Sequence, residues 1–80
     1  ARFSLIFELV RSNQVIACLK MIMANHNLVQ DCDNERKTPL HWACHNDSNE
    51  MVQILVDFGA QITAKDDYAR KPIDELISTL

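Results

Sequence analysis

The chain has 80 residues, a formal net charge of −3 and a sequence pI of about 5.4. Hydrophobic residues make up 48% and charged residues 24%, a composition typical of a globular chain and not of a disordered one. The acidic balance argues against nucleic acid and anionic membranes as partners, because both favour a basic surface. The three cysteines leave at least one free thiol, which fits a reducing compartment, either cytoplasm or nucleus.

The first part of the chain is predicted to hold two helices. The pattern indicates a helix over about residues 5–12, a break at Asn13 and Gln14, and a second helix over about 15–24. Polar residues 25–27 then lead out of this unit. The apolar start of the chain is too short for a membrane span. Because the chain does not begin with Met, we expect it to be a fragment of a longer protein.

The middle of the chain has the clearest signals. Polar residues 33–36 predict a turn, and Thr38 and Pro39 predict the start of a helix. Thr can accept a hydrogen bond from a free first-turn amide, and Pro at the first helical position loses nothing because its amide would be unpaired. This helix runs through Cys44 and is broken by residues 46–49.

A second helix of this unit is predicted over about residues 50–58. Its apolar residues cover more than one face, so the helix has to be covered on two sides. Gly59, the single glycine of the chain, lies where this helix must end and suits a left-handed residue after the helix.

The third unit is predicted to contain one helix only. A polar turn at 66–70 is followed by Pro72, which opens the helix. Its apolar residues Ile73, Leu76 and Ile77 have no second helix to cover them. We therefore expect marginal stability, self-association through this uncovered C-terminal helix, or cover from residues outside the 80.

A period of 33 residues relates the three units. Pro39 and Pro72 are separated by this spacing, and so are Asp33 and Asp66. The same shift pairs Phe7 with Leu40 and preserves the class of most residues in the second helices. Matches along most of a period, in both directions, predict a helical repeat protein.

Residues 38–44, Thr-Pro-Leu-His-Trp-Ala-Cys, resemble the Thr-Pro-Leu-His-x-Ala signature that opens each ankyrin repeat. Residues 52–60 resemble the second helix of that repeat with its Gly-Ala ending. The resemblance implies an all-α, ankyrin-type repeat solenoid, in which helix-turn-helix pairs are joined by short β-hairpin-like fingers. It divides a single region, 1–80, into a divergent repeat at 1–32, a full repeat at 33–65 and a partial repeat at 66–80.

The chain departs from the family pattern at its glycines. The hairpin-turn glycine is replaced by Arg36 and Ala69, and the glycine between the helices by Gln14 and Asp47. At the end of the second helix of the first unit, His26 stands in its place. Because most side chains are strained at positive φ, we expect the fingers to be reshaped.

One group of residues could carry chemistry: His41, Cys44 and His45, with Cys32 nearby, contain zinc-ligand and nucleophile types. A structural interpretation explains them better. The resemblance implies that His41 forms hydrogen bonds near Thr38 and that Cys44 fills a small position in the core. We therefore predict no catalytic residue, no metal and no cofactor.

The resemblance implies a scaffold that binds another protein through the concave face of the stack. Trp42 is the variable position of the signature and a candidate hot spot, or else it packs on the neighbouring repeat or on Lys37. Lys37 and Arg70 could form a small basic rail. An alternative is a regulatory or assembly segment of a larger enzyme or channel. The candidate binding residues are Asn34, Glu35, Lys37, Trp42, His45, Asn46, Asp67, Tyr68 and Arg70.

Overall fold

The computed structural model describes residues 5–78, with side chains as far as residue 75. Within these residues the chain is helical, and no strand occurs. The elements in chain order are α1 (Leu5–Arg11), α2 (Val15–Ala24), the 3₁₀ helix η1 (His26–Gln30), α3 (Pro39–His45), α4 (Asn49–Asp57) and α5 (Pro72–Ser78). None of the described helices is long and apolar enough to cross a membrane.

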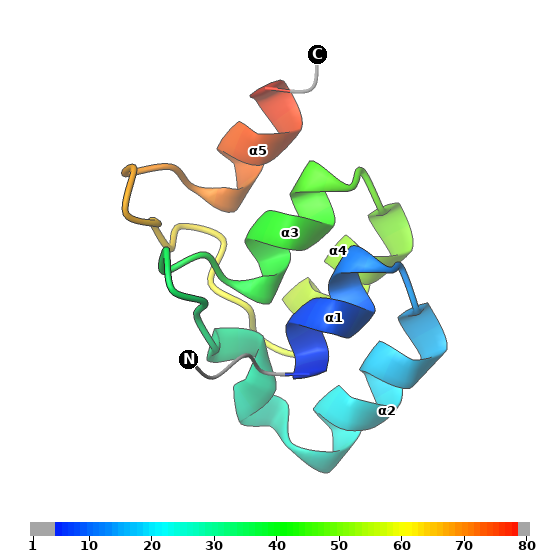
Figure 1. The fold of residues 1–80 in the computed structure, drawn as a ribbon. Helices are drawn as coiled ribbons and strands as arrows, with labels where there is room; N and C mark the ends of the chain where they lie inside the picture. Colours follow the sequence, from blue (N-terminus) through cyan, green and yellow to red (C-terminus); the bar gives the residue numbers. More distant parts are fainter. Residues whose placement is uncertain (1–4, 79–80) are drawn as a thin grey trace.

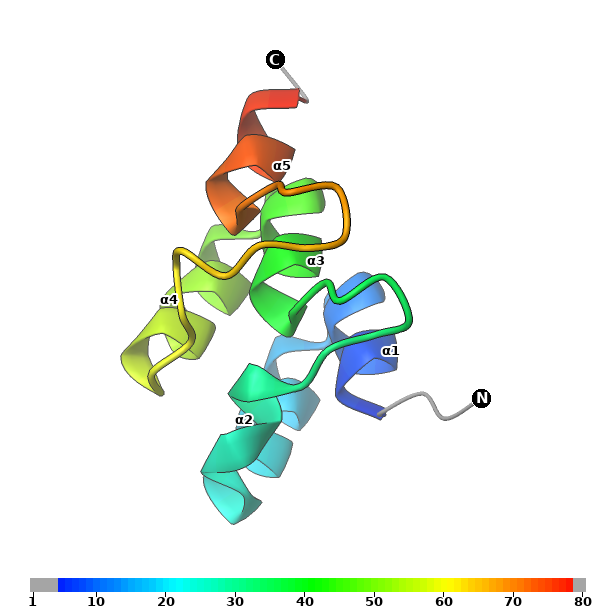
Figure 2. The ribbon, with the colours of Figure 1, turned by 90° about the vertical axis from the view of Figure 1, so that its left-hand side faces the viewer.

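The helices are arranged in two layers. Helices α1, α3 and α5 stack one above another, and α2 and α4 lie beside α1 and α3 in a second layer (Figure 1, Figure 2). Two loops cross the stack in parallel on one side, one leading into α3 and the other into α5 (Figure 2). We call their turns, residues 33–37 and 66–70, the first and second fingers.

The predicted helices are confirmed, and their ends agree with the structure to within about a residue. Helix η1 was not predicted. It begins because Asn25 ends α2 in an extended conformation (φ −152°) and its side chain accepts a hydrogen bond from the amide of Asn27. No left-handed residue is needed at this helix end, so His26 can occupy the position where the family has glycine.

Three helix ends share one hydrogen-bonding pattern. After α1, α3 and α4, a left-handed residue is followed by an amide that bonds five residues back, which is the Schellman arrangement. The left-handed residues are Asn13 (φ 58°), Asp47 (φ 56°) and Gly59 (φ 95°). Asn and Asp tolerate this conformation better than other side chains do. Gly59 and Asp47 lie where they were predicted.

The prediction that Gln14 replaces the interhelical glycine is wrong, because Asn13 takes that conformation. The cause is the spacing of the first unit: α1 begins at Leu5 and α3 at Pro39, an offset of 34 residues. The buried counterpart of Leu40 is therefore Ile6 and not Phe7, although Phe7 is buried as well. The extra residue lies in the turn between α1 and α2.

The core runs between the two layers. Its outer-layer members recur every four residues, with Cys18 and Ile22 on α2 and Met51 and Leu55 on α4, all fully buried. The inner helices contribute small groups, and Cys44 is 6% exposed, which confirms the predicted core role. The remaining buried apolar residues are Ile6, Phe7, Val10, Val29, Leu40, Ala43 and Ala60.

The end of the stack at α5 has an open apolar groove of about 420 Å³ between α4 and α5. Ile73, which lines it, is 50% exposed, whereas its counterpart Leu40 is 2% exposed because α4 covers it. The side chains of Leu76 and Ile77, also predicted to lie on this face, are outside the described residues.

Candidate functional site

The first finger is held together by the side chain of Asp33. Its Oδ1 accepts hydrogen bonds from the amides of Glu35 (2.8 Å) and Lys37 (2.9 Å). The amide of Asp33 in turn donates to the carbonyl of Lys37 (3.0 Å), which closes the turn. Arg36 adopts the left-handed conformation inside it (φ 61°).

The second finger repeats this design. Asp66 Oδ1 accepts from the amides of Tyr68 (2.9 Å) and Arg70 (3.0 Å), and Ala69 is left-handed (φ 59°). The expectation that the fingers are reshaped is therefore wrong. A left-handed non-glycine residue costs about 1–2 kcal/mol. The aspartate hydrogen bonds offset this cost, because each satisfies two amides that the turn leaves free.

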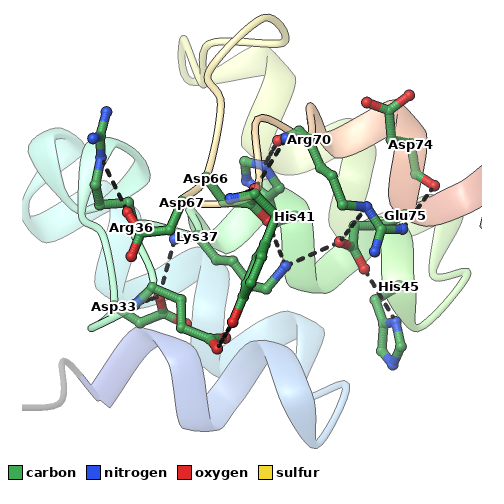
Figure 3. Close-up of polar contacts among 12 residues, drawn as sticks. Asp33, Arg36, Lys37, His41, His45, Asp66, Asp67, Arg70, Asp74 and Glu75 are labelled. Atoms are coloured by element: carbon green, nitrogen blue, oxygen red, sulfur yellow. Dashed lines mark hydrogen bonds and ion pairs between the residues drawn. The ribbon is translucent and has the colours of Figure 1, made fainter.

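The two fingers are joined tip to tip. The amide of Asp67 donates to the carbonyl of Glu35 (2.9 Å), and the Tyr68 hydroxyl donates to Glu35 Oε2 (2.9 Å). A weaker ion pair links Arg36 Nε to Asp67 Oδ1 at 3.8 Å (Figure 3). The tips therefore present Glu35 and Tyr68 as a bonded pair.

Below the tips lies a partly buried ionic cluster. Lys37 Nζ contacts Asp66 Oδ2 (2.6 Å) and Glu75 Oε1 (3.0 Å), and Arg70 Nε lies 3.7 Å from the same oxygen of Glu75 (Figure 3). The Lys37 side chain is only 12% exposed and that of Asp66 is fully buried. The predicted basic rail is wrong, because carboxylates bind both of its cations.

The cluster shifts the protonation of its members. Burial by itself would raise the pKa of Asp66, but hydrogen bonds from Lys37 and from the amides of Arg70 and Tyr68 lower it to about 2. Burial would lower the pKa of Lys37, but its bonds to Asp66 and Glu75 raise it above the usual value. All the charges of this pair are therefore favoured near neutral pH.

His41 connects the second unit to the third. The amide of Thr38 donates to His41 Nδ1 (3.0 Å), so this nitrogen carries no proton. The other nitrogen, Nε2, then donates to the carbonyl of Arg70 (2.8 Å). Thr38 Oγ1 also accepts from the His41 amide, which completes a capping box. The predicted hydrogen bonding of His41 near Thr38 is confirmed.

Trp42 lies between the first finger and α1. Its Nε1–H donates to Asp33 Oδ2 (3.0 Å), and the guanidinium of Arg11 lies 5.6 Å from the ring centroid. His45 approaches the ring edge-on, with centroids 5.9 Å apart. The indole is half-buried, which agrees with packing on the neighbouring repeat, one of the two interpretations offered by the sequence.

The nine candidate residues fall into two groups. Asn34, Asp67 and Tyr68 lie exposed on the fingers, with Glu35 half-buried among them, and His45 is exposed on α3. Lys37, Trp42, Asn46 and Arg70 make internal contacts; for example, the amide of Asn46 donates to the carbonyls of Val10 and Arg11.

The sequence interpretation missed Glu8 and Arg11, which form an ion pair (2.7 Å) beside Trp42. The 33-residue shift directed attention to Leu9 instead. A shift of 34 residues, the spacing of the two helix starts, pairs Trp42 with Glu8 and His45 with Arg11.

The side chains that could carry chemistry do not converge. His41 is engaged by Thr38 and Arg70, and His45 Nδ1 lies 3.4 Å from Glu75 Oε2. Burial, together with the charge of Glu75, raises the pKa of the Cys44 thiol and keeps it protonated. The described residues contain no group of three or more His, Cys, Asp or Glu side chains arranged to hold a metal ion.

Stacked helix pairs joined by fingers of one repeated design define a helical repeat protein of the solenoid class. The family model described as ankyrin repeats (3 copies) matches residues 5–73. The chain therefore belongs to the ankyrin repeat family.

Three relatives show the range of proteins that contain similar segments. The chain is 31% identical over 68 residues to the mouse 26S proteasome non-ATPase regulatory subunit 10, which covers 85% of this chain and 29% of that protein. It is 32% identical over 73 residues to the serine/threonine-protein kinase VIK of Arabidopsis thaliana, covering 91% and 17%. It is 33% identical over 60 residues to palmitoyltransferase akr1 of Neurospora crassa, covering 75% and 8%.

Proposed function

We propose that this chain is a non-catalytic module that binds another protein through its finger face. We define the finger face as the two fingers together with the neighbouring residues Glu8, Arg11, Trp42, His45 and Glu75. The observation that carries the proposal is the exposed ring of Tyr68 at a finger tip, 62% exposed yet held in place by its bond to Glu35. A fixed, exposed aromatic ring loses little entropy on binding, so it suits an interface anchor.

Affinity capture from cell extract with wild type and Tyr68→Ala tests this proposal. Because Tyr68 is exposed, we expect the variant to lose a specifically captured protein while its unfolding curve stays close to wild type. Ile16→Ala is a matched control, because Ile16 is 71% exposed on α2, away from the fingers. Equal capture by all three proteins would contradict a finger-face interface.

A second candidate is a regulatory or assembly segment within a larger enzyme or channel. It is favoured by the two relatives whose names are those of a kinase and a palmitoyltransferase. The chain spans less than a third of each of the three relatives, so their activities are not assigned to it. Sequencing the parent transcript on both sides of residues 1–80 tests this candidate, since a catalytic or channel domain there would favour it.

The open groove beside α5 supports a further part of the proposal, which is self-association through this end of the stack. Ile62 and Ile73 at the groove are 61% and 50% exposed. Sedimentation of wild type, Ile73→Gln and the control Ile16→Gln tests it, because only the first substitution should shift a dimer towards monomer. As the compartment we propose cytoplasm or nucleus, since Cys18, Cys32 and Cys44 are all free thiols.

A further inference from the structure

The charges of the finger face are unequally matched. Each of its four cations is bound by a carboxylate: Arg11 by Glu8, Arg36 by Asp67, Lys37 by Asp66 and Glu75, and Arg70 by Glu75. Six carboxylates face these four cations, because Asp33 and Glu35 also belong to this face. Two of the three net negative charges of the chain therefore lie here.

The two unmatched carboxylates differ in what surrounds them. Asp33 uses Oδ1 for two finger amides and Oδ2 for the indole N–H of Trp42, so both oxygens are engaged. Glu35 forms no ion pair with any described residue, and its side chain accepts one hydrogen bond, from the Tyr68 hydroxyl. Glu35 is therefore the carboxylate of this face that can still take a cation.

Tyr68 makes the same place attractive to a cation. Its hydrogen bond to Glu35, followed by the charges of Glu35 and Asp67, raises the pKa of Tyr68 even though Lys37 opposes the shift. The potential at the tip is therefore negative. The ring is 62% exposed, and an exposed aromatic face attracts Lys or Arg by a cation–π interaction of about 0.5–1 kcal/mol.

We propose that the finger tips recognise a cationic side chain of the partner, which pairs with the Glu35 carboxylate and lies against the Tyr68 ring. This inference rests on the proposed function and adds the chemistry of the partner, a segment that carries Lys or Arg. Recognition of an acidic segment is disfavoured, because the cations of the finger face are already bound by its own carboxylates.

Selection from a random peptide display library on the 80-residue chain tests the inference. We expect Lys and Arg to be enriched over Asp and Glu by about threefold, the factor that a surface ion pair supplies. Glu35→Gln should abolish the enrichment. Glu50→Gln, the same change at an exposed residue of α4, should retain it, which separates a local contact from the effect of net charge.

The remaining outcomes are also decisive. Enrichment of acidic residues, failure to select any peptide, or enrichment that persists in Glu35→Gln would each overturn the inference. The proposed function fails separately: if Tyr68→Ala loses the protein captured from extract while Glu35→Gln keeps it, the binding face stands and the cation contact does not. Unfolding curves of each variant show that the chain remains folded.

Discussion

Four residues with side chains adopt the left-handed conformation that glycine usually supplies: Asn13, Arg36, Asp47 and Ala69. Asn and Asp tolerate it through local polar contacts, but Arg and Ala do not. The two fingers therefore store a small strain, and Asp33 and Asp66 counter it with two amide hydrogen bonds each. The finger shape is thus decided by the aspartate that precedes the strained residue.

Ala69→Gly should stabilise the chain by up to about 1 kcal/mol, because the left-handed strain removed slightly exceeds the backbone entropy lost on folding. Ala69 is exposed, so no packing changes. Chemical denaturation measures the difference. The control Ala24→Gly, at the end of α2, should lose stability, and a loss at both positions would contradict the strain argument.

Lys37 is the residue on which the buried charges of the cluster depend. Replacing it by Met leaves Asp66 and Glu75 without their shared cation, and we expect a loss of about 3 kcal/mol in the free energy of unfolding. Lys65→Met, at an exposed site, should change stability by less than about 0.5 kcal/mol. Similar losses for both would show that the cluster adds nothing specific.

At the scale of elements, the ionic cluster joins the first finger to the second finger and to α5. Its contribution depends on pH in two windows. The lowered pKa of Asp66 means that its stabilisation is complete above the ordinary value of 3.8 and is lost as the pH falls towards about 2. The raised pKa of Lys37 means that its stabilisation is present below 10.5 and is lost as the pH rises beyond the folded-state value.

Asp66→Asn should therefore flatten the acid limb of a plot of urea midpoint against pH. The amide oxygen of Asn can still accept the finger hydrogen bonds, so the turn itself is kept. Asp57→Asn is the matched control, because Asp57 is exposed on α4 and contacts only Gln53 in the described structure. An acid limb as steep in Asp66→Asn as in wild type would exclude the cluster as its cause.

At the scale of the whole molecule, neighbouring units stabilise one another, as in other repeat stacks. His41 is one of the connections, since its buried ring bonds both its own helix start and the carbonyl of Arg70 in the next finger. Removing it leaves two polar groups unpaired and creates a cavity. The damage should spread first to the third unit, which has no second helix among the described residues.

We expect His41→Ala to lower stability by about 2–4 kcal/mol. Hydrogen exchange should show larger losses of protection in residues 66–70 and α5 than in α1 and α2. His45→Ala, at a side chain that is 52% exposed, provides the control. Uniform loss of protection along the chain would mean that the three units unfold together.

Local chemistry in the sequence determined most of the fold. The Thr38-Pro39 start, the glycine after α4 and the 33-residue period follow from rules that act within a few residues or one repeat, so they could be predicted. The single extra residue of the first unit was not predicted, because Asn13 and Gln14 are both polar and the pattern does not say which one turns left-handed.

Only the tertiary structure decided the character of the candidate site. Lys37 and Arg70 have the same charge in the sequence, and nothing local shows that Asp66 and Glu75, 29 and 38 residues after Lys37, bind them. Nor does the sequence show that Trp42 would use its N–H on Asp33 and its face on Arg11. Charge pairing depends on distance in space, so the fingers changed from a predicted basic rail to a surface with one unmatched carboxylate, Glu35.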